Sequence, residues 1–393
     1  MNWRTLQWVG LALLVGTILM ACQPKSEHTV GPMGEARGKA VRPGTPLQFP
    51  QDHGAHNDYG IEWWYITANL FDEQGRQHGV QWTLFRFAGE PVNDEATNAA
   101  VDAVANAAAS DWWQGQWYMG HLGWSPPPGL GKHRAWERWG RGGNNEPQTA
   151  QAGVRAAPFS AWLDNWLLQS RDTEFLPLNL VAQQDEFAMA LVLDDSPLVR
   201  HGEDGYSQKS ADGSLASFYY SYPLLKVSGH LKSDDGWFPV TGTAWLDREW
   251  SSKFLDPRFA GWDWLSAQLD SGEALMTFCM RPEQGADPSL RNCAGSIVTP
   301  DGALHPLDHH QIDWRATAWS ELDDGRYPVA WQVGIDAPQV LANPWQLEVE
   351  TLSSDQRNQL AFPYWEGPVR ILDGESGSQR GVGFIEMTGY SRH

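Results

Sequence analysis

Three charged residues, Asp247, Arg248 and Glu249, lie between two tryptophans, Trp245 and Trp250. Charged side chains are costly to bury among aromatic rings unless they are paired, so this run is a candidate site. In a regular strand Asp247 and Glu249 share one face and Arg248 lies on the other. A carboxyl group beside apolar walls has a raised pKa and can donate a proton, as protonation of an alkene or assisted hydrolysis requires. The alternative is an Arg–carboxylate pair that closes one end of a barrel.

A second polar group precedes an aromatic strand earlier in the chain. Glu62 opens that strand, and His53, His56 and Asp58 come just before it. His56 with Glu62 or Asp58 can form an acid–base pair, or the residues can form a structural turn network. Two histidines and one aspartate in a loop are a weak zinc signal, and we expect no metal and no cofactor. The candidate catalytic residues are Asp247, Glu249, Glu62 and His56.

The chain contains 23 tryptophans, far above ordinary usage. Such residues favour sheets, in which they fill a core or line a cavity for a flat or polyene-like ligand. His121, flanked by strand residues, is either a buried core residue or part of the site. The candidate ligand-binding residues are Trp64, Trp245, Trp264, Arg248 and His121.

The elements that position these residues are repeated. An aromatic strand at 62–70, a turn at Gly75 and a strand at 80–86 recur about 200 residues later as 261–269, Gly272 and 275–281. The matched positions are Trp63/Trp262, Ile66/Leu265, Thr67/Ser266, Ala68/Ala267, Asn69/Gln268, Leu70/Leu269 and Arg86/Arg281. This self-similarity predicts two copies of one fold.

Short alternating runs separated by Gly, Asp and Pro turns dominate the rest of the chain and predict an all-β architecture. The exception is the Ala-rich segment 93–110, for which we expect a short helical insert in the first half. We place the boundary near Tyr222 and Pro223, with an N-terminal domain at 50–223 and a C-terminal domain at 224–393.

The N-terminus reads as a targeting segment. Arg4 precedes an apolar run that is too short to span a membrane comfortably, and the run ends in Leu19-Met20-Ala21-Cys22. This ending resembles the lipobox of bacterial lipoproteins, which implies cleavage of residues 1–21 and lipidation of Cys22. Residues 22–49 then form a flexible tether. Gln23 resembles the sorting pattern for the outer membrane, so we expect an anchor on its periplasmic face.

Two further cysteines, Cys279 and Cys293, flank a segment with Pro, Gly and Asp that reads as a hairpin loop. An oxidising envelope permits a disulfide between them, which would contribute about 3 kcal/mol in the chain-entropy model. The alternative is a pair of buried thiols.

Charge and absent motifs restrict the function. A net charge of −20 argues against nucleic acid and against docking on anionic headgroups. The chain has no Gly-x-Ser-x-Gly elbow, no His-Glu-x-x-His, no phosphate loop and no dinucleotide fingerprint. The common serine hydrolases, zinc proteases and nucleotide enzymes therefore lose support.

Longer motifs carry a family resemblance. The string 52–65, the runs 242–250 and 261–264, and the closing segments 364–367 and 383–390 resemble AttH-like proteins, which are related to carotenoid 1,2-hydratases. The resemblance covers roughly residues 50–390 and implies two lipocalin-like antiparallel β-barrels in tandem. Relatives are called predicted secreted hydrolases, a label that implies no known reaction.

The hydratase branch is thought to use a His-x-Trp pair and a Tyr-x-Asp pair. Trp245-Leu246-Asp247 resembles the second pair with Trp in place of Tyr, and the segment 218–222, where the first pair would fall, has no His. Only Asp247 carries over.

Three functions remain open. The first is an envelope lipoprotein that binds an apolar or amphipathic small molecule in a barrel, and the resemblance suggests ABC-transporter components as its partners. The second is an acid–base hydrolase or hydratase acting on a lipid- or isoprenoid-like substrate. The third is a structural accessory of a membrane complex.

Overall fold

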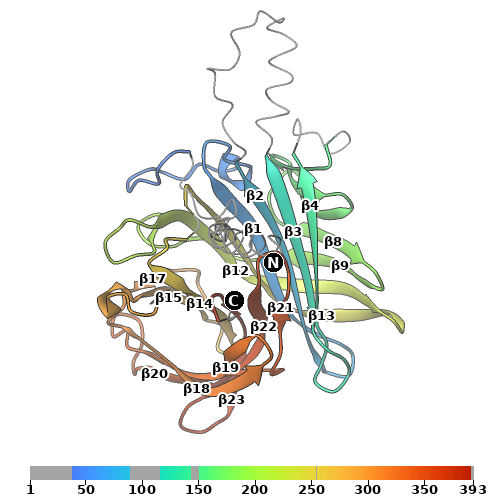
Figure 1. Ribbon diagram of the computed structural model, residues 1–393. Coiled ribbons are helices and arrows are strands. Elements are labelled where there is room, and N and C mark those ends of the chain that lie inside the picture. The colour runs from blue at the N-terminus through green and yellow to red at the C-terminus, as the bar shows by residue number, and fades with distance from the viewer. Residues whose placement is uncertain (1–37, 89–115, 143–149, 254, 391–393) are drawn as a thin grey trace, which may run out of the picture.

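The computed structural model describes residues 38–88, 116–142, 150–253 and 255–390 (Figure 1). These residues form two curled antiparallel sheets and two short 3₁₀ helices, η1 (Gln51–His53) and η3 (Pro288–Leu290). This confirms the all-β prediction. The signal segment, Cys22, most of the tether and the helix expected at 93–110 lie outside the described residues. Within the described part, no helix has the length and apolar character needed to cross a membrane.

The first sheet has 13 strands, in the order β4-β3-β2-β1-β13-β12-β9-β8-β7-β6-β5, with β10 and β11 paired to β12. One isolated bridge between Gly142 and Ala152 brings its two edges together, so the sheet nearly closes. Its strands are β1 (Ile61–Phe71), β2 (Gln77–Phe87), β3 (Trp117–Ser125), β4 (Arg134–Arg141), β5 (Ala152–Ala156), β6 (Phe159–Leu163), β7 (Trp166–Ser170), β8 (Leu178–Gln184), β9 (Phe187–Asp194), β10 (Val199–Arg200), β11 (Tyr206–Gln208), β12 (Ala216–Ser233) and β13 (Gly236–Ser251).

The second sheet has ten strands, in the order β17-β16-β15-β14-β23-β22-β20-β19-β18, with β21 paired to β22. It curls beside β1, β12 and β13, at the lower left of Figure 1. Its strands are β14 (Phe259–Leu269), β15 (Ala274–Pro282), β16 (Asn292–Val298), β17 (Leu304–Leu307), β18 (Ile312–Leu322), β19 (Gly325–Ile335), β20 (Trp345–Thr351), β21 (Arg357–Asn358), β22 (Tyr364–Asp373) and β23 (Gln379–Met387).

The first sheet extends further along the chain than expected. Strand β12 runs through Tyr222 and Pro223, where the sequence suggested a boundary, and β13 then pairs with β1 at the centre of the same sheet. The two sheets divide between Ser251 and Phe259. At Pro223, where the sequence predicted a boundary, β12 has a shift in register and then continues.

Three apolar cores hold the molecule together. One fills the inside of the first sheet and contains Trp64, Ile66 and Leu70, and a second fills the inside of the second sheet. The third lies between the sheets and includes Tyr65 and Trp264. Strand β1 is therefore buried on both faces, with even-numbered residues facing the first core and odd-numbered residues facing the second sheet.

The repeat explains how the sheets pack. Asn69 Nδ2 on β1 donates to the Gly383 carbonyl on β23 at 3.1 Å, and Gln268 Nε2 on β14 donates to the Ala244 carbonyl on β13 at 2.8 Å. Asn69 and Gln268 are matched positions, and Ala244 and Gly383 lie opposite the matched residues Ala68 and Ala267. Reciprocal contacts of this kind mark an interface with an approximate two-fold axis.

Cys279 on β15 and Cys293 on β16 are direct partners in the register, and their sulfur atoms form a disulfide. The bridge ties β16 to β15, whose Phe278 and Met280 pack in the core between the sheets.

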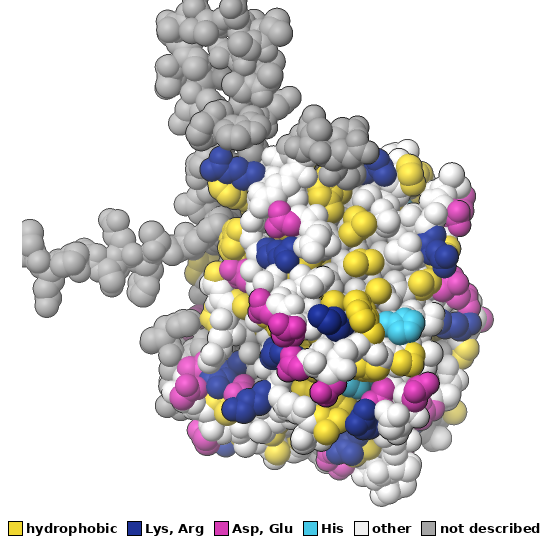
Figure 2. All heavy atoms as spheres, turned by 90° about the vertical axis from the view of Figure 1, so that its right-hand side faces the viewer, with side chains coloured by type: hydrophobic (Ala, Val, Ile, Leu, Met, Phe, Trp, Pro, Cys, Tyr) yellow, Lys and Arg dark blue, Asp and Glu magenta, His cyan; other side chains and the backbone are white. Residues whose placement is uncertain are grey.

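The outer surface of the first sheet carries mixed charge. On the face shown in Figure 2, basic and acidic side chains are interspersed with apolar ones. No broad patch of one sign is visible there among the described residues.

Candidate active site

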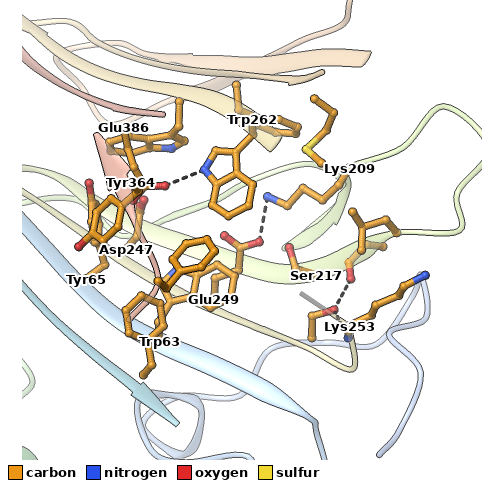
Figure 3. A pocket seen from close by; sticks show the side chains of 18 residues that line it. Trp63, Tyr65, Lys209, Ser217, Asp247, Glu249, Lys253, Trp262, Tyr364 and Glu386 are labelled. Carbon is orange, nitrogen blue, oxygen red and sulfur yellow. Dashed lines mark hydrogen bonds and ion pairs between the residues drawn. The ribbon is translucent and has the colours of Figure 1, made fainter. Parts of the chain in front are cut away.

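A cavity of about 110 Å³ lies between the two sheets and contains the strongest candidate chemistry (Figure 3). Aromatic and aliphatic side chains form most of its wall, and three carboxyl groups and two lysines also reach it. The apolar lining residues are Trp63, Tyr65, Phe85, Leu215, Trp262, Trp264, Phe278, Met280, Phe362 and Tyr364, and the charged ones are Asp247, Glu249, Glu386, Lys209 and Lys253.

The cavity lies where the two repeats face each other. Trp63 and Trp262 are matched positions, and both line it. Tyr65 lies opposite Asp247 in the β1–β13 register, and Trp264, the matched residue, lies opposite Glu386 in the β14–β23 register. Asp247 and Glu386 are thus equivalent residues of the two copies, and they reach one cavity from opposite sheets.

Asp247 is almost completely buried, with 3% of its surface exposed. Its Oδ1 accepts hydrogen bonds from Trp245 Nε1 (2.5 Å) and from the Ser221 hydroxyl, and its Oδ2 accepts one from the Tyr219 hydroxyl (2.8 Å). Burial raises the pKa of Asp247 to about 7 against the opposing effect of these donors. A substantial fraction therefore carries a proton at neutral pH.

Glu386 has a similar environment on the opposite wall. Trp262 Nε1 donates to its Oε1 at 2.6 Å. Burial, with further contributions from the charges of Asp247 and Glu249, raises its pKa to about 7. Like charges so close favour a state in which one of the two groups is protonated and the other ionised.

Glu249 differs because it has a cation beside it. Its Oε1 lies 2.9 Å from Lys209 Nζ, which itself sits 4.5 Å from the ring centres of Tyr219 and Phe278. Figure 3 shows this pair towards one end of the cavity, with Asp247, Tyr65, Tyr364 and Glu386 at the other. The ion pair with Lys209 makes Glu249 a charged anchor at this end of the cavity.

Glu62 and His56, which were expected to be catalytic, do not line this cavity. Glu62 is an even-numbered residue of β1, so its side chain points away from the second sheet. On that side it pairs with Arg86 and Arg248. Burial opposes its ionisation, but the two guanidinium groups outweigh burial and hold its pKa well below the ordinary value. His56 Nδ1 lies 3.1 Å from Glu62 Oε2, and its ring stacks on Trp250 at 4.0 Å.

This network corresponds to the structural alternative considered for both motifs. Arg248 also lies over the ring of Trp64, 3.8 Å from its centre, so neither residue lines the cavity. Asp247 and Glu249 lie on one face of β13 and line the cavity, whereas Arg248 lies on the other face and pairs with Glu62, as the alternation along the strand predicts.

The remaining predicted residues lie in or beside the cavity. Trp264 lines it, and Trp245 lies behind Asp247 with its ring 6.3 Å from that of Trp264. His121 is fully buried one layer further out, where its Nδ1 contacts the Tyr364 hydroxyl at 2.9 Å. The cavity itself lies between the sheets and not inside a barrel, because apolar side chains fill the interior of the first sheet.

Sequence reasoning missed Glu386, Lys209, Tyr219 and Tyr364. The repeat could have indicated Glu386. Residues 383–387 pair with the second repeat strand in the same way as residues 244–248 pair with the first. Tyr219 and Lys209 had no such signal. Among the described residues, no group of three or more His, Cys, Asp or Glu side chains could hold a metal ion.

Two curled antiparallel sheets that pack through duplicated strands around a shared cavity define a tandem lipocalin-like protein. The AttH-like family model matches residues 40–390, so the chain belongs to the AttH-like family. A comparison with curated proteins gives no match.

Two solved structures are similar to this one. A "putative AttH" from Nitrosomonas europaea has 32% sequence identity and a TM-score of 0.73, with 90% of this chain and 100% of that chain covered. Kievitone hydratase from Nectria haematococca has 13% identity and a TM-score of 0.61, with coverage of 91% and 98%. At that identity the second likeness concerns the fold.

Proposed function

We propose that this protein is a hydratase that adds water to a carbon–carbon double bond of an apolar or amphipathic small molecule. The observation that carries the proposal is the buried carboxyl group of Asp247, whose pKa is raised to about 7 at the wall of an aromatic cavity. Glu386, the equivalent residue of the other repeat, supplies the second group that acid–base chemistry needs.

In the reaction one proton passes from the protein to the substrate, and one proton passes from the attacking water to the protein. Protonated Asp247 donates its proton to one alkene carbon, and the other carbon becomes a carbocation. The faces of Trp63, Trp262 and their aromatic neighbours stabilise this positive charge. A water molecule forms a C–O bond with the cation and loses a proton to ionised Glu386. No electrons are exchanged, so no redox cofactor is required.

The comparisons support this choice over hydrolysis. The chain belongs to the AttH-like family, and one protein of similar fold is a hydratase. The residue that resembles the family's Tyr-x-Asp aspartate is Asp247. This protein has Trp245 where the pattern has Tyr. The Tyr219 hydroxyl on β12 instead makes the contact between a tyrosine and the Asp247 carboxyl group. The geometry thus compensates for the sequence departure.

A carrier is the second candidate, because the aromatic lining would hold an apolar ligand without converting it. A lipid anchor at Cys22 would serve either function, since apolar compounds concentrate in membranes. A carrier and an enzyme differ only in whether the bound molecule gains water.

The test is a screen of isoprenoid and aryl alkenes with the purified protein in ¹⁸O-labelled water. Mass spectrometry should detect a product heavier by one labelled water. The Asp247→Asn variant should lose about 10²–10⁴-fold in turnover, the usual contribution of a general acid, while ligand quenching of tryptophan fluorescence persists. Binding by the wild type without any labelled product would favour the carrier.

Asp263→Asn is the matched control. Asp263 is also a buried carboxyl residue, but it bonds to Tyr390 at 2.9 Å and Arg281 at 3.2 Å and does not line the cavity. Its variant should keep turnover per folded molecule. Equal losses in both variants would show that burial of a carboxyl group, and not the position of Asp247, controls activity.

A further inference from the structure

A chain of polar side chains leads from the cavity to the surface through the first sheet. Tyr364 on β22 lines the cavity, and its hydroxyl lies 2.9 Å from His121 Nδ1 on β3. His121 Nε2 lies 3.2 Å from Glu137 Oε2 on β4. Tyr364 and His121 are buried, whereas the Glu137 side chain is 15% exposed. Three polar side chains, joined by two consecutive contacts, thus connect solvent to the cavity.

The direction of the hydrogen bonds follows from burial. Burial lowers the pKa of His121 despite the carboxylate beside it, so the ring is neutral at pH 7. A neutral imidazole donates from one nitrogen and accepts at the other. The Glu137 carboxylate can only accept, so Nε2 carries the proton and Nδ1 accepts the Tyr364 O–H.

Among the described residues, no titratable group other than Tyr364 and Glu137 is hydrogen-bonded to His121. Phe85 presents its ring at 5.3 Å, and the Tyr364 ring lies at 5.5 Å. Gln81 Nε2 donates to the same Tyr364 hydroxyl at 3.1 Å, which fixes the position of that oxygen. Glu137 is held in turn by Trp139 Nε1 at 2.6 Å and the Ala361 amide at 3.1 Å.

At the inner end the chain meets the cavity's carboxyl groups. Glu366, two residues along β22 from Tyr364, is fully buried and interacts with that hydroxyl. The Tyr65 hydroxyl donates to Glu366 Oε1 at 2.5 Å, while its Oε2 has no hydrogen-bond partner. Glu366 lies directly opposite Glu386 in the β22–β23 register. Directly opposed residues have Cβ atoms about 5 Å apart, so the Glu366 side chain lies beside that of Glu386, whose charge acts on it.

The proposed hydration leaves Glu386 protonated while product still fills the cavity and blocks exchange through its mouth. We propose that Glu137, His121 and Tyr364 form a proton relay that returns Glu386 to its ionised state. Tyr364 passes its proton to His121 Nδ1 as Nε2 releases one to Glu137, and the proton of Glu386 restores Tyr364 through Glu366. Glu137 then releases its proton to water, and rotation of the His121 ring restores the Nε2–H tautomer. Asp247, which gave its proton to the alkene, takes one back from the water that enters when product leaves. The need for a relay rests on the proposed function, whereas the hydrogen-bonded chain from Tyr364 to Glu137 does not depend on that function.

The kinetic test compares the first turnover with steady-state turnover. In His121→Asn, which changes a residue outside the cavity lining, the first turnover should stay within about twofold of wild type, because the proton for that turnover is already on Asp247. Steady-state turnover should fall at least about tenfold, with a larger solvent deuterium isotope effect. Equal losses in both phases would assign the residue a packing role, and unchanged rates would exclude a relay.

His133→Asn is the matched control. His133 also has both ring nitrogens bonded, to Ser125 Oγ at 2.9 Å and to Asn358 Oδ1 at 2.7 Å, but it does not line the cavity. Its variant should keep both rates and the isotope effect. A tenfold steady-state loss in this variant as well would overturn the assignment.

A second measurement requires no substrate. Nuclear magnetic resonance of ¹⁵N-histidine-labelled protein should show His121 neutral at pH 7 with its proton on Nε2. That proton should exchange with water at least about tenfold more slowly in Glu137→Gln. An imidazolium at pH 7, or exchange unaffected by Glu137, would make the contact a static pair and overturn the relay. If the protein hydrates no alkene, the proposed function fails while this measurement still decides the relay.

Discussion

Two buried carboxyl groups of the first sheet show how the surroundings decide the chemistry of one residue type. Glu62 and Asp247 lie on neighbouring strands, both almost without solvent contact. Glu62 has two guanidinium partners and stays ionised, whereas Asp247 has only neutral donors and a pKa raised to about 7. A proton donor at neutral pH requires the second environment, so the proposed function assigns the proton to Asp247 rather than to Glu62.

Glu62→Gln tests the structural role at the scale of one residue. The change leaves Arg86 and Arg248 buried without a counter-charge, so the free energy of unfolding should fall by about 3–5 kcal/mol. Because the pKa of Glu62 is depressed, its stabilisation is present above the unfolded value of about 4.3 and is lost as pH falls. Urea unfolding from pH 3 to 7 should show a smaller acid loss in the variant.

Glu73→Gln, in the exposed turn after β1, serves as the control and should change the free energy by less than about 0.5 kcal/mol. Turnover per folded molecule should survive Glu62→Gln. A large loss of kcat in soluble, folded Glu62→Gln would restore the catalytic role that the sequence suggested.

At the scale of elements, the repeat predicted the strands but not the face that carries the site. The strands expected at 62–70 and 261–269 are observed as β1 and β14. Alternation normally tells a buried face from an exposed one, but β1 and β13 are buried on both faces near the cavity. Hydrophobicity along the strands therefore did not show which face carries the candidate site, that of Tyr65 and Asp247 or that of Trp64 and Arg248. Only the packing of the second sheet makes that choice.

The reciprocal amide contacts offer a test of the duplicated interface. Gln268 donates to Ala244 and also to the Pro223 carbonyl at 2.7 Å, and it accepts from the Thr243 hydroxyl at 2.5 Å. Asn69 donates once across the interface and accepts from Gln77 within its own sheet. Truncation should therefore cost about 2–3 kcal/mol for Gln268→Ala and about 1–2 kcal/mol for Asn69→Ala.

Chemical denaturation with tryptophan fluorescence provides both values. Gln332→Ala, an exposed amide on β19, is the control and should be nearly neutral. The reverse ranking, or no loss in either variant, would show that the two sheets are held by the apolar core alone.

At the scale of the whole molecule, the β1–β13 pairing unites the halves. It joins residues 61–71 to residues 241–251, and no local sequence signal indicates such a distant pairing. Because of this pairing, the first sheet continues past the boundary expected at Pro223. The same pairing brings Asp247 beside Tyr65 and thus places half of the candidate active site at the junction between the sheets.

The cavity makes the stability of the whole molecule depend on pH in a direction opposite to that of Glu62. A carboxyl group with a raised pKa binds its proton more tightly in the folded state, so stability falls as pH rises from about 4 to about 7. Since a tenfold change in proton affinity corresponds to 1.36 kcal/mol, the difference between 3.8 and about 7 makes ionised Asp247 cost about 4 kcal/mol. Glu386 adds a cost of the same sign.

Removing the ionisable group should relieve that cost. Asp247→Asn should be more stable than wild type by about 2–4 kcal/mol at pH 8. The difference should become small near pH 4, where Asp247 is protonated in the folded protein and about half protonated in the unfolded chain. Urea midpoints measured from pH 4 to 8 check this, with Asp194→Asn on the exposed end of β9 as a control that should follow wild type. A constant difference across this range would mean that Asp247 is ionised throughout, and an ionised Asp247 cannot protonate an alkene.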